Sequence, residues 1–215
     1  TLDGTGFGRL CSTEPEAVAL PGRPASIVVT ASEVLVTVRE PGLLMAFRRA
    51  DADAGADAGA GLVETARVTL PADAWGLAVS PDEQTAVVTS AWTHRVSSID
   101  LEAKKLLSSV DVGREPRGVV VSADGKAAYV SHLVATPGDL TRIDALRDAE
   151  PRVRKVALPI ARARAANPAA GPNDSGVSAT LGYALTLSKD GKRLYAPRHA
   201  IGAVGDQAWF GATRS

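Results

Sequence analysis

Three short stretches of this chain carry nearly the same letters, and each stands between two apolar runs. They read SPDEQ at 80–84, SADGK at 122–126 and SKDGK at 188–192. Recurrence at such spacings indicates a repeat array, in which each unit packs against its neighbours. The apolar runs before the turns are 75–80, 117–122 and 183–188, those after them are 85–90, 127–131 and 193–197, and a fainter copy of the pair occupies 26–30 and 33–38.

Each copy is typical of two short strands joined by a turn. The flanking runs are five or six residues long and rich in Val, Leu and Tyr, which favours strands. Asp-Gly at 124–125 and at 190–191 predicts two-residue hairpin turns with positive φ angles. Asp82-Glu83 lacks the glycine, so we expect the hairpin at 80–85 to be looser or differently built.

Two further strands follow in each unit, and their apolar and polar residues alternate as in a sheet with one face exposed to water. Four antiparallel strands per unit are typical of a β-propeller blade. We therefore expect an all-β chain built from four-stranded antiparallel blades. These further strands are expected at 95–100 and 105–111 in one unit and at 140–144 and 152–157 in the next.

The repeat resembles the YVTN-repeat β-propellers, the group related to surface-layer and YncE-like proteins. The likeness covers about 22–200 and rests on four stretches: VSSIDL at 96–101, GREP at 113–116, SADGK at 122–126 and AYVS at 128–131. The family's Tyr-Val-Thr-Asn is changed in this chain, to YVSH at 129–132. The resemblance implies a propeller and a periplasmic, cell-surface or extracellular location. It says little about activity, because propellers host many functions.

The repeats predict one partial propeller domain over 1–215 with about three and a half blades. Because an open ring exposes sheet edges, we expect a larger ring of six to eight blades, completed by a longer protein or by association of chains. The expected blades are about 22–70, 71–112, 113–158 and 181–215, the last with a third strand near 207–211, and the insertions are an Asp/Ala/Gly stretch at 50–61 and a proline-rich stretch at 158–180.

The composition of the chain argues against nucleic-acid and membrane partners and against an internal disulfide. Lys plus Arg number 24 and Asp plus Glu also number 24, so net charge does not favour nucleic acid or an anionic membrane surface. No apolar stretch is long enough to span a bilayer. The single cysteine, Cys11, cannot form an internal disulfide, and we expect it to be buried or, less favoured, bonded to a partner.

Candidate binding residues gather at one face of the predicted propeller. The loops that lead into the first strand of each blade, and the loops between second and third strands, share a face. Three histidines at one face could bind a metal ion, although a structural role is favoured and the metal stays unknown. We expect Asp100 and Asp144 to cap turns. The lead-in loops contribute Trp75, Arg114 and Arg117, and the second-to-third loops contribute Trp92, His94, His132 and His199.

Three hypotheses for function follow. The first is a non-catalytic module that binds a protein or a small ligand through the loop face, with no cofactor in this segment. The second is the propeller portion of a larger redox protein of the cytochrome c or haem-peroxidase type, whose haem would lie beyond Ser215, because this chain contains no CxxCH motif. The third is a metal-dependent propeller lyase or lactonase that uses face-loop histidines.

Overall fold

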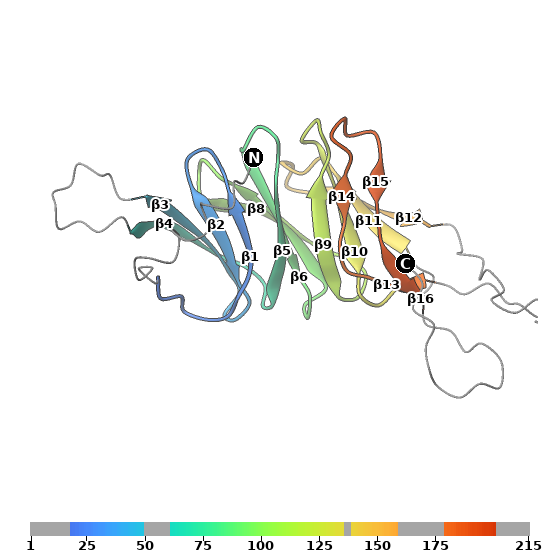
Figure 1. Cartoon of the computed structure of the whole chain (residues 1–215), viewed down its shortest axis with the longest axis horizontal. Coiled ribbons are helices and arrows are strands. Elements are labelled where there is room, and N and C mark those ends of the chain that lie inside the picture. The colour runs from blue at the N-terminus through green and yellow to red at the C-terminus, as the bar shows by residue number, and fades with distance from the viewer. Residues whose placement is uncertain (1–17, 50–60, 136–138, 159–178, 201–215) are drawn as a thin grey trace, which may run out of the picture.

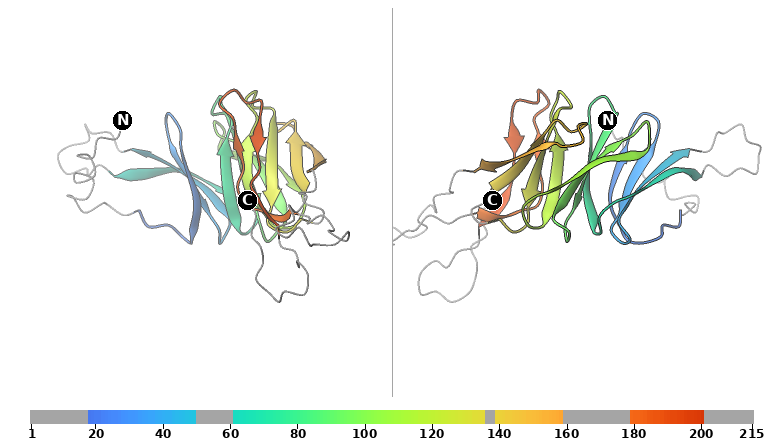
Figure 2. Two further views of the ribbon diagram at one scale, coloured as in Figure 1. Left: turned by 45° about the vertical axis from the view of Figure 1, so that its right-hand side comes forward. Right: turned by 180° about the vertical axis from the view of Figure 1, so that it is seen from behind.

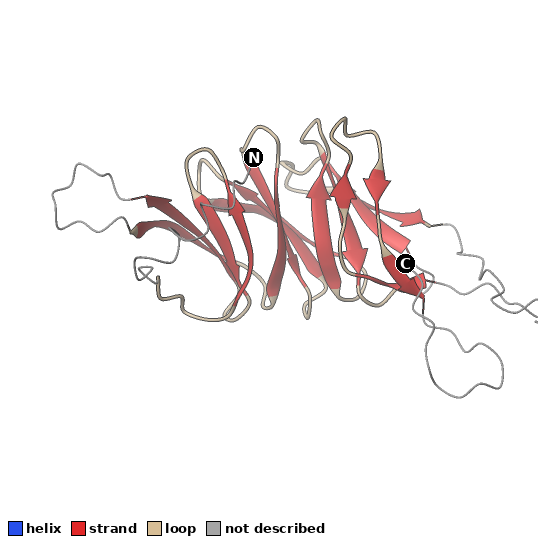
Figure 3. Ribbon diagram, in the orientation of Figure 1, coloured by secondary structure: helices blue, strands red, loops and turns tan. Residues whose placement is uncertain are grey.

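The computed structural model describes residues 18–49, 61–135, 139–158 and 179–200, and every regular element in these ranges is a β-strand (Figure 3). Three antiparallel sheets of four strands follow one another along the chain. The first contains β1 (Pro24–Val29), β2 (Val34–Val38), β3 (Leu43–Arg49) and β4 (Leu62–Thr69). The second contains β5 (Ala74–Val79), β6 (Thr85–Ser90), β7 (Arg95–Asp100) and β8 (Lys105–Asp111). The third contains β9 (Pro116–Val121), β10 (Ala127–His132), β11 (Asp139–Asp144) and β12 (Arg152–Ala157).

A fourth sheet is present in part, as two short antiparallel pairs. One pair joins β13 (Ala179–Gly182) to β16 (Arg198–Ala200), and the other joins β14 (Thr186–Leu187) to β15 (Leu194–Tyr195). Of the second strand expected over 193–197, only β15 is a strand, and β16 begins one residue after that range. The third strand expected near 207–211, Cys11 and nearly all of both insertions lie outside the described residues.

The sheets stand side by side in chain order, with β1, β5 and β9 next to one another (Figures 1 and 2). Successive four-stranded sheets packed in this way are blades of a propeller, and the predicted fold class is confirmed. In the described residues no helix has the length and apolar character needed to cross a membrane.

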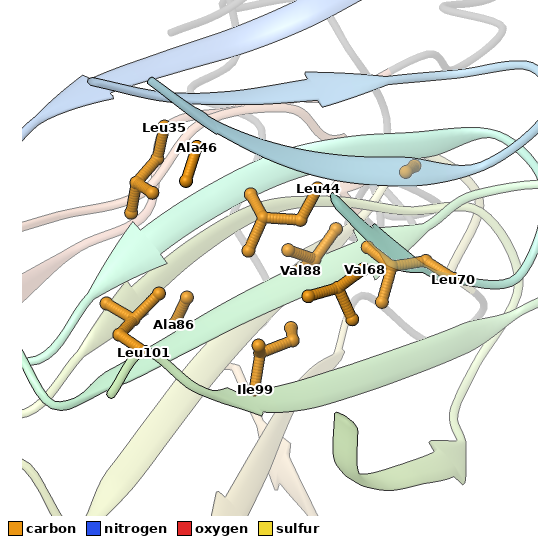
Figure 4. Packing of buried hydrophobic residues seen from close by; sticks show 10 residues of the cluster. Leu35, Leu44, Ala46, Val68, Leu70, Ala86, Val88, Ile99 and Leu101 are labelled. Atoms are coloured by element: carbon orange, nitrogen blue, oxygen red, sulfur yellow. The ribbon is translucent and has the colours of Figure 1, made fainter. Parts of the chain in front are cut away.

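Buried side chains between the blades hold them together. Between blades 1 and 2, Leu35 and Leu44 face Val88 and Ile99 (Figure 4). The neighbouring residue Val87 belongs instead to the cluster between blades 2 and 3. Because successive side chains of a strand point to opposite faces, β6 must be apolar at consecutive positions to serve both interfaces.

The three repeated turns are the same structure, which corrects two predictions. In each, the third residue after the serine donates its N–H to the serine carbonyl at 2.8–2.9 Å and has a positive φ: Glu83 (55°), Gly125 (71°) and Gly191 (67°). Asp124 has no positive φ, so these are not two-residue hairpin turns. The 80–85 hairpin is not looser either, because Glu83 adopts the left-handed conformation that glycine adopts in the other two.

An aspartate completes each turn. The Ser122 hydroxyl donates to Asp124 Oδ1 (2.6 Å) and accepts from the N–H of Ala127 (2.9 Å), while Oδ1 also accepts from the N–H of Lys126 (3.1 Å). The same bonds recur around Asp82 and Asp190. The Ser122 hydroxyl, followed by the Lys126 N–H, lowers the pKa of Asp124 below its ordinary value. The repeated letters therefore encode a hydrogen-bonded turn.

A hydroxyl near the end of the second strand of each blade joins neighbouring strands. The Oγ1 atoms of Thr37 and Thr89 accept the N–H of Ser26 (3.0 Å) and Gly76 (2.8 Å), where the pairing of first and second strands is irregular. Ser131 accepts the N–H of Gly118 in the same way (3.0 Å). Each hydroxyl satisfies an amide that the irregular ladder leaves without a strand partner.

Two of these hydroxyls also reach the next blade. Thr37 Oγ1 donates to the carbonyl of Trp75 (2.9 Å), and Thr89 Oγ1 donates to the carbonyl of Arg117 (3.0 Å). Gly76 lies at this junction, where an added Cβ would come 2.2 Å from the Arg117 carbonyl oxygen. The first strands can therefore approach closely only because residue 76 is a glycine.

Candidate functional site

Most candidate residues lie at one edge of the sheets, where β5 and β9 begin and β6 and β10 end (the lower edge in Figure 1). We call this the lead-in edge. Arg114, Trp92 and His94 stand in connections, as expected. Four residues assigned to loops lie in strands instead: Trp75 in β5, Arg117 in β9, His132 in β10 and His199 in β16. Trp75 and Arg117 also open the apolar runs at 75–80 and 117–122, whereas His132 ends β10 one residue beyond the run at 127–131.

Trp75 stands between two arginines at this edge. The Arg117 guanidinium lies 4.1 Å from the centroid of the Trp75 ring, and the Arg39 guanidinium lies 4.5 Å from it. Tyr183 meets Trp75 edge to face, with ring centroids 6.3 Å apart. Arg117 and Tyr183 occupy the same repeat position as Trp75, so β5, β9 and the segment between β13 and β14 bring equivalent side chains together. Both cation–π and edge-to-face contacts are favourable.

Asp73 holds the two arginines in place. Its fully buried carboxylate accepts from Arg39 Nε at 2.5 Å, and its Oδ2 atom lies 3.9 Å from Arg117 Nη1. Arg117 Nη2 is also paired with Glu115 at 2.9 Å. Asp73 Oδ2 and the Nε and Nη1 atoms of Arg117 are buried without a hydrogen-bond partner among the described residues. Their mutual attraction at 3.9 Å offsets part of the cost of burial.

Sequence reasoning missed Arg39 and Asp73. A signal for Asp73 was present, because DAWG at 73–76 aligns with EPRG at 115–118, so Asp73 and Glu115 are equivalent. Both residues have positive φ, 60° and 48°. An acidic residue two positions before Trp75 and Arg117 is therefore part of the repeat. Arg39 gave no signal, since its partners are 34 or more residues away.

Two aromatic side chains at this edge are open to solvent. Trp92 is 55% exposed and Tyr183 is 52% exposed. The Arg39 guanidinium lies 5.5 Å from the centroid of the Trp92 ring, so Arg39 stands over both Trp75 and Trp92. We call Arg39, Asp73, Trp75, Trp92, Glu115, Arg117 and Tyr183 the aromatic–arginine cluster. It combines buried charge pairs with exposed rings.

Two of the histidines, His94 and His132, contact the loop that leads into β9. His132 is buried; its Nδ1 contacts the carbonyl of Arg114 (3.1 Å) and its Nε2 contacts Thr141 Oγ1 (2.8 Å). A neutral ring that donates from Nδ1 and accepts at Nε2 satisfies both contacts. Burial lowers the pKa of His132, which favours that neutral form. The N–H of Glu115 donates to His94 Nδ1 (3.2 Å).

This arrangement gives His132 a structural role. Both of its ring nitrogens have protein partners, so neither is available to a metal ion. His199 pairs with Leu181 in the backbone, and its side chain is outside the described residues. Within the part of the chain that the structure describes, no three His, Cys, Asp or Glu side chains lie close enough to hold a metal.

Arg114 directly precedes Glu115 of the aromatic–arginine cluster and lines, with His132, a hollow of about 330 Å³. Asp139 and Lys155 also line this hollow, so charges of both signs border it. Six of the seven predicted site residues have described side chains, and these six divide between two neighbouring groups. Trp75, Trp92 and Arg117 belong to the cluster, whereas His94, Arg114 and His132 belong to the β9 lead-in loop and its surroundings.

The two aspartates expected to cap turns differ. Asp100 accepts from the N–H groups of Glu102 (2.9 Å) and Ala103 (2.8 Å), which confirms its capping role. Asp144 instead pairs with the side chains of Arg142 (2.8 Å) and Arg154 (2.5 Å) across the outer strands. The expectation for Asp144 was wrong, because flanking arginines that sequence alone does not place compete for its carboxylate.

Three four-stranded blades and part of a fourth define this chain as part of a β-propeller. Hydrazine synthase of Kuenenia stuttgartiensis matches it with a TM-score of 0.60 and 22% identity, over 89% of this chain and 46% of that chain. The Cps50 (Swd1) β-propeller domain of Myceliophteria thermophila matches with a TM-score of 0.60 and 12% identity, over 84% of this chain and 50% of that chain.

This chain therefore spans about half the length of each of these two structures. At such identities the likeness establishes the fold alone. No family model matches the sequence, and none of the curated proteins matches it.

Proposed function

We propose that this chain is a propeller module that binds a protein partner through the lead-in edge, with the aromatic–arginine cluster at the centre of the contact. Exposure of Trp92 and Tyr183 supports this most directly. Tryptophan, tyrosine and arginine are the residues that most often dominate binding energy at protein interfaces. Large aromatic side chains exposed together on a rigid framework also mark interaction surfaces.

The framework under these rings is rigid. Trp75 is held between two guanidinium groups, and Arg39 is bonded to the buried Asp73. A preorganised surface loses little conformational entropy when a partner binds.

Selection of displayed random peptides on the immobilised protein tests this function. We expect selected peptides to bind at least about tenfold more weakly to the Trp92→Ala and Tyr183→Ala variants, as for residues central to an interface. Tyr195→Ala is the matched control, since Tyr195 is 50% exposed but lies on β15. Peptides that bind all three variants like the original protein would show that the lead-in edge is not the binding surface.

The resemblance to YVTN-repeat propellers and an envelope or extracellular location stay proposals. They are supported by the quoted repeat letters and by the propeller fold that those letters predicted. Fractionation of the cells that produce this protein would test the location.

A further inference from the structure

We infer that Arg39 receives a side-chain carboxylate of the bound protein, so that the partner segment is acidic. This inference rests on the proposed function and specifies the partner's chemistry. It starts from the way in which Arg39 is held, because a guanidinium that is fixed on one side and open on the other is a ready-made carboxylate site.

Three contacts fix the Arg39 guanidinium. Its Nε is bonded to Asp73 at 2.5 Å, and its plane lies over the rings of Trp75 (4.5 Å) and Trp92 (5.5 Å). The side chain of Asp73 is fully buried. The side chain of Arg39 has therefore already lost most of its rotamer freedom before any ligand arrives, which removes a cost that a mobile surface arginine would incur.

The other edge of the same guanidinium is open. Within the described residues, the two terminal nitrogens of Arg39 take no hydrogen bond or ion pair, and the side chain is 22% exposed. They are not among the polar atoms buried without a partner, unlike Nε and Nη1 of Arg117. The two terminal nitrogens of Arg39 are thus not fully buried, and a carboxylate can accept one N–H from each of them side by side.

The neighbouring charges favour Arg39 over Arg117 as the receiving group. Arg117 is buried, and its Nη2 is already paired with Glu115 at 2.9 Å. Trp92 stands beside Arg39 with 55% of its surface exposed. A segment that carries Glu or Asp next to an apolar or aromatic residue would satisfy both groups, because the carboxylate meets Arg39 while its neighbour packs on Trp92.

Two capped pentapeptides provide the test: one has two glutamates on each side of a phenylalanine, and the other has glutamines in their place. Titration by calorimetry at low ionic strength should show the glutamate peptide binding at least about tenfold more tightly, as for a charge-assisted pair. In the Arg39→Gln/Asp73→Asn double variant, whose amides can replace the buried ion pair, this advantage should disappear. In Asp73→Asn alone, which keeps Arg39, it should persist.

The outcomes separate the two proposals. If both peptides bind equally and Trp92→Ala weakens both, the edge binds proteins but Arg39 does not receive a carboxylate. If neither peptide binds, the acidic-partner inference fails, whereas the use of this edge is decided by the selected peptides and the Trp92→Ala and Tyr183→Ala variants. If inorganic phosphate binds the original protein more tightly than the glutamate peptide does, and the double variant loses it, the ligand is a phosphate group and the carboxylate assignment is wrong.

Discussion

The Thr89 hydroxyl lies 3.0 Å from the carbonyl oxygen of Arg117 and 2.8 Å from the amide nitrogen of Gly76. One side chain thus closes an irregularity within blade 2 and binds blade 2 to blade 3. Thr37 does the same between blades 1 and 2. Packing of apolar faces brings blades together without fixing their register, whereas these directional bonds set how each first strand sits beside the next.

Thr89→Val should destabilise the fold by about 2–4 kcal/mol, because it leaves one buried donor and one buried acceptor without partners. The two side chains have nearly the same shape, so the change isolates the hydroxyl. Urea unfolding followed by fluorescence measures the loss. Thr89→Ser keeps the hydroxyl and serves as the control; equal stability of the Val and Ser variants would refute the bridging role.

Gly125→Ala should cost about 1–2 kcal/mol, because residue 125 has a φ of 71° and an L side chain is strained there. A Cβ added at residue 125 would lie 3.7 Å from its nearest neighbouring atom, which is an ordinary contact. The loss of stability in Gly125→Ala therefore measures backbone strain alone. Gly191→Ala should cost more, since its Cβ would come 2.6 Å from the Cβ of Ala123. Thermal or urea unfolding of the two variants compares them, and the reverse order would contradict the described turn.

Asp73→Ala should destabilise the protein by about 3–5 kcal/mol, because Arg39 and Arg117 lose the buried carboxylate that they share. Asp73→Asn keeps a hydrogen-bond acceptor and should cost less. The fluorescence of Trp75 and Trp92 should change as the arginines move. Unaltered stability and an unaltered spectrum in Asp73→Ala would show that the carboxylate does not organise the cluster.

His132 should make stability depend on pH. Burial places its folded pKa below the ordinary value of 6.5, so the unfolded chain takes up a proton first as the pH falls. Stability is therefore complete above about pH 6.5 and declines as the pH drops from there toward the folded pKa.

His132→Gln, which does not titrate, should lack this decline. The difference in urea midpoint between the original protein and the variant, measured from pH 7.5 to pH 5, isolates the histidine from the carboxylates. A constant difference across that range would mean that His132 is protonated equally in the folded and unfolded chains.

Local patterns predicted the strands of the first three blades well. The outer strands expected at 95–100 and 105–111 match β7 and β8, and the apolar runs before the turns match β5 and β9 closely. Alternation and turn residues are short-range signals, and they act within one strand or hairpin. The prediction of a looser hairpin at 80–85 was wrong for a local reason too. The hydrogen bonds of Ser80 and Asp82 hold Glu83 in the left-handed conformation, although it is not a glycine.

Sequence by itself determined that this chain is a series of four-stranded units with a shared turn, and that Trp75, Arg117 and Tyr183 hold equivalent positions. Only the tertiary structure decided that Arg39, Asp73 and Trp92 join them, and that His132 is buried with both nitrogens occupied. The alternation of residues along a strand predicts on which face of the sheet a side chain lies. It does not predict which side chains of the next blade contact it. Those contacts arise from packing between sheets, which depends on distant residues meeting in space.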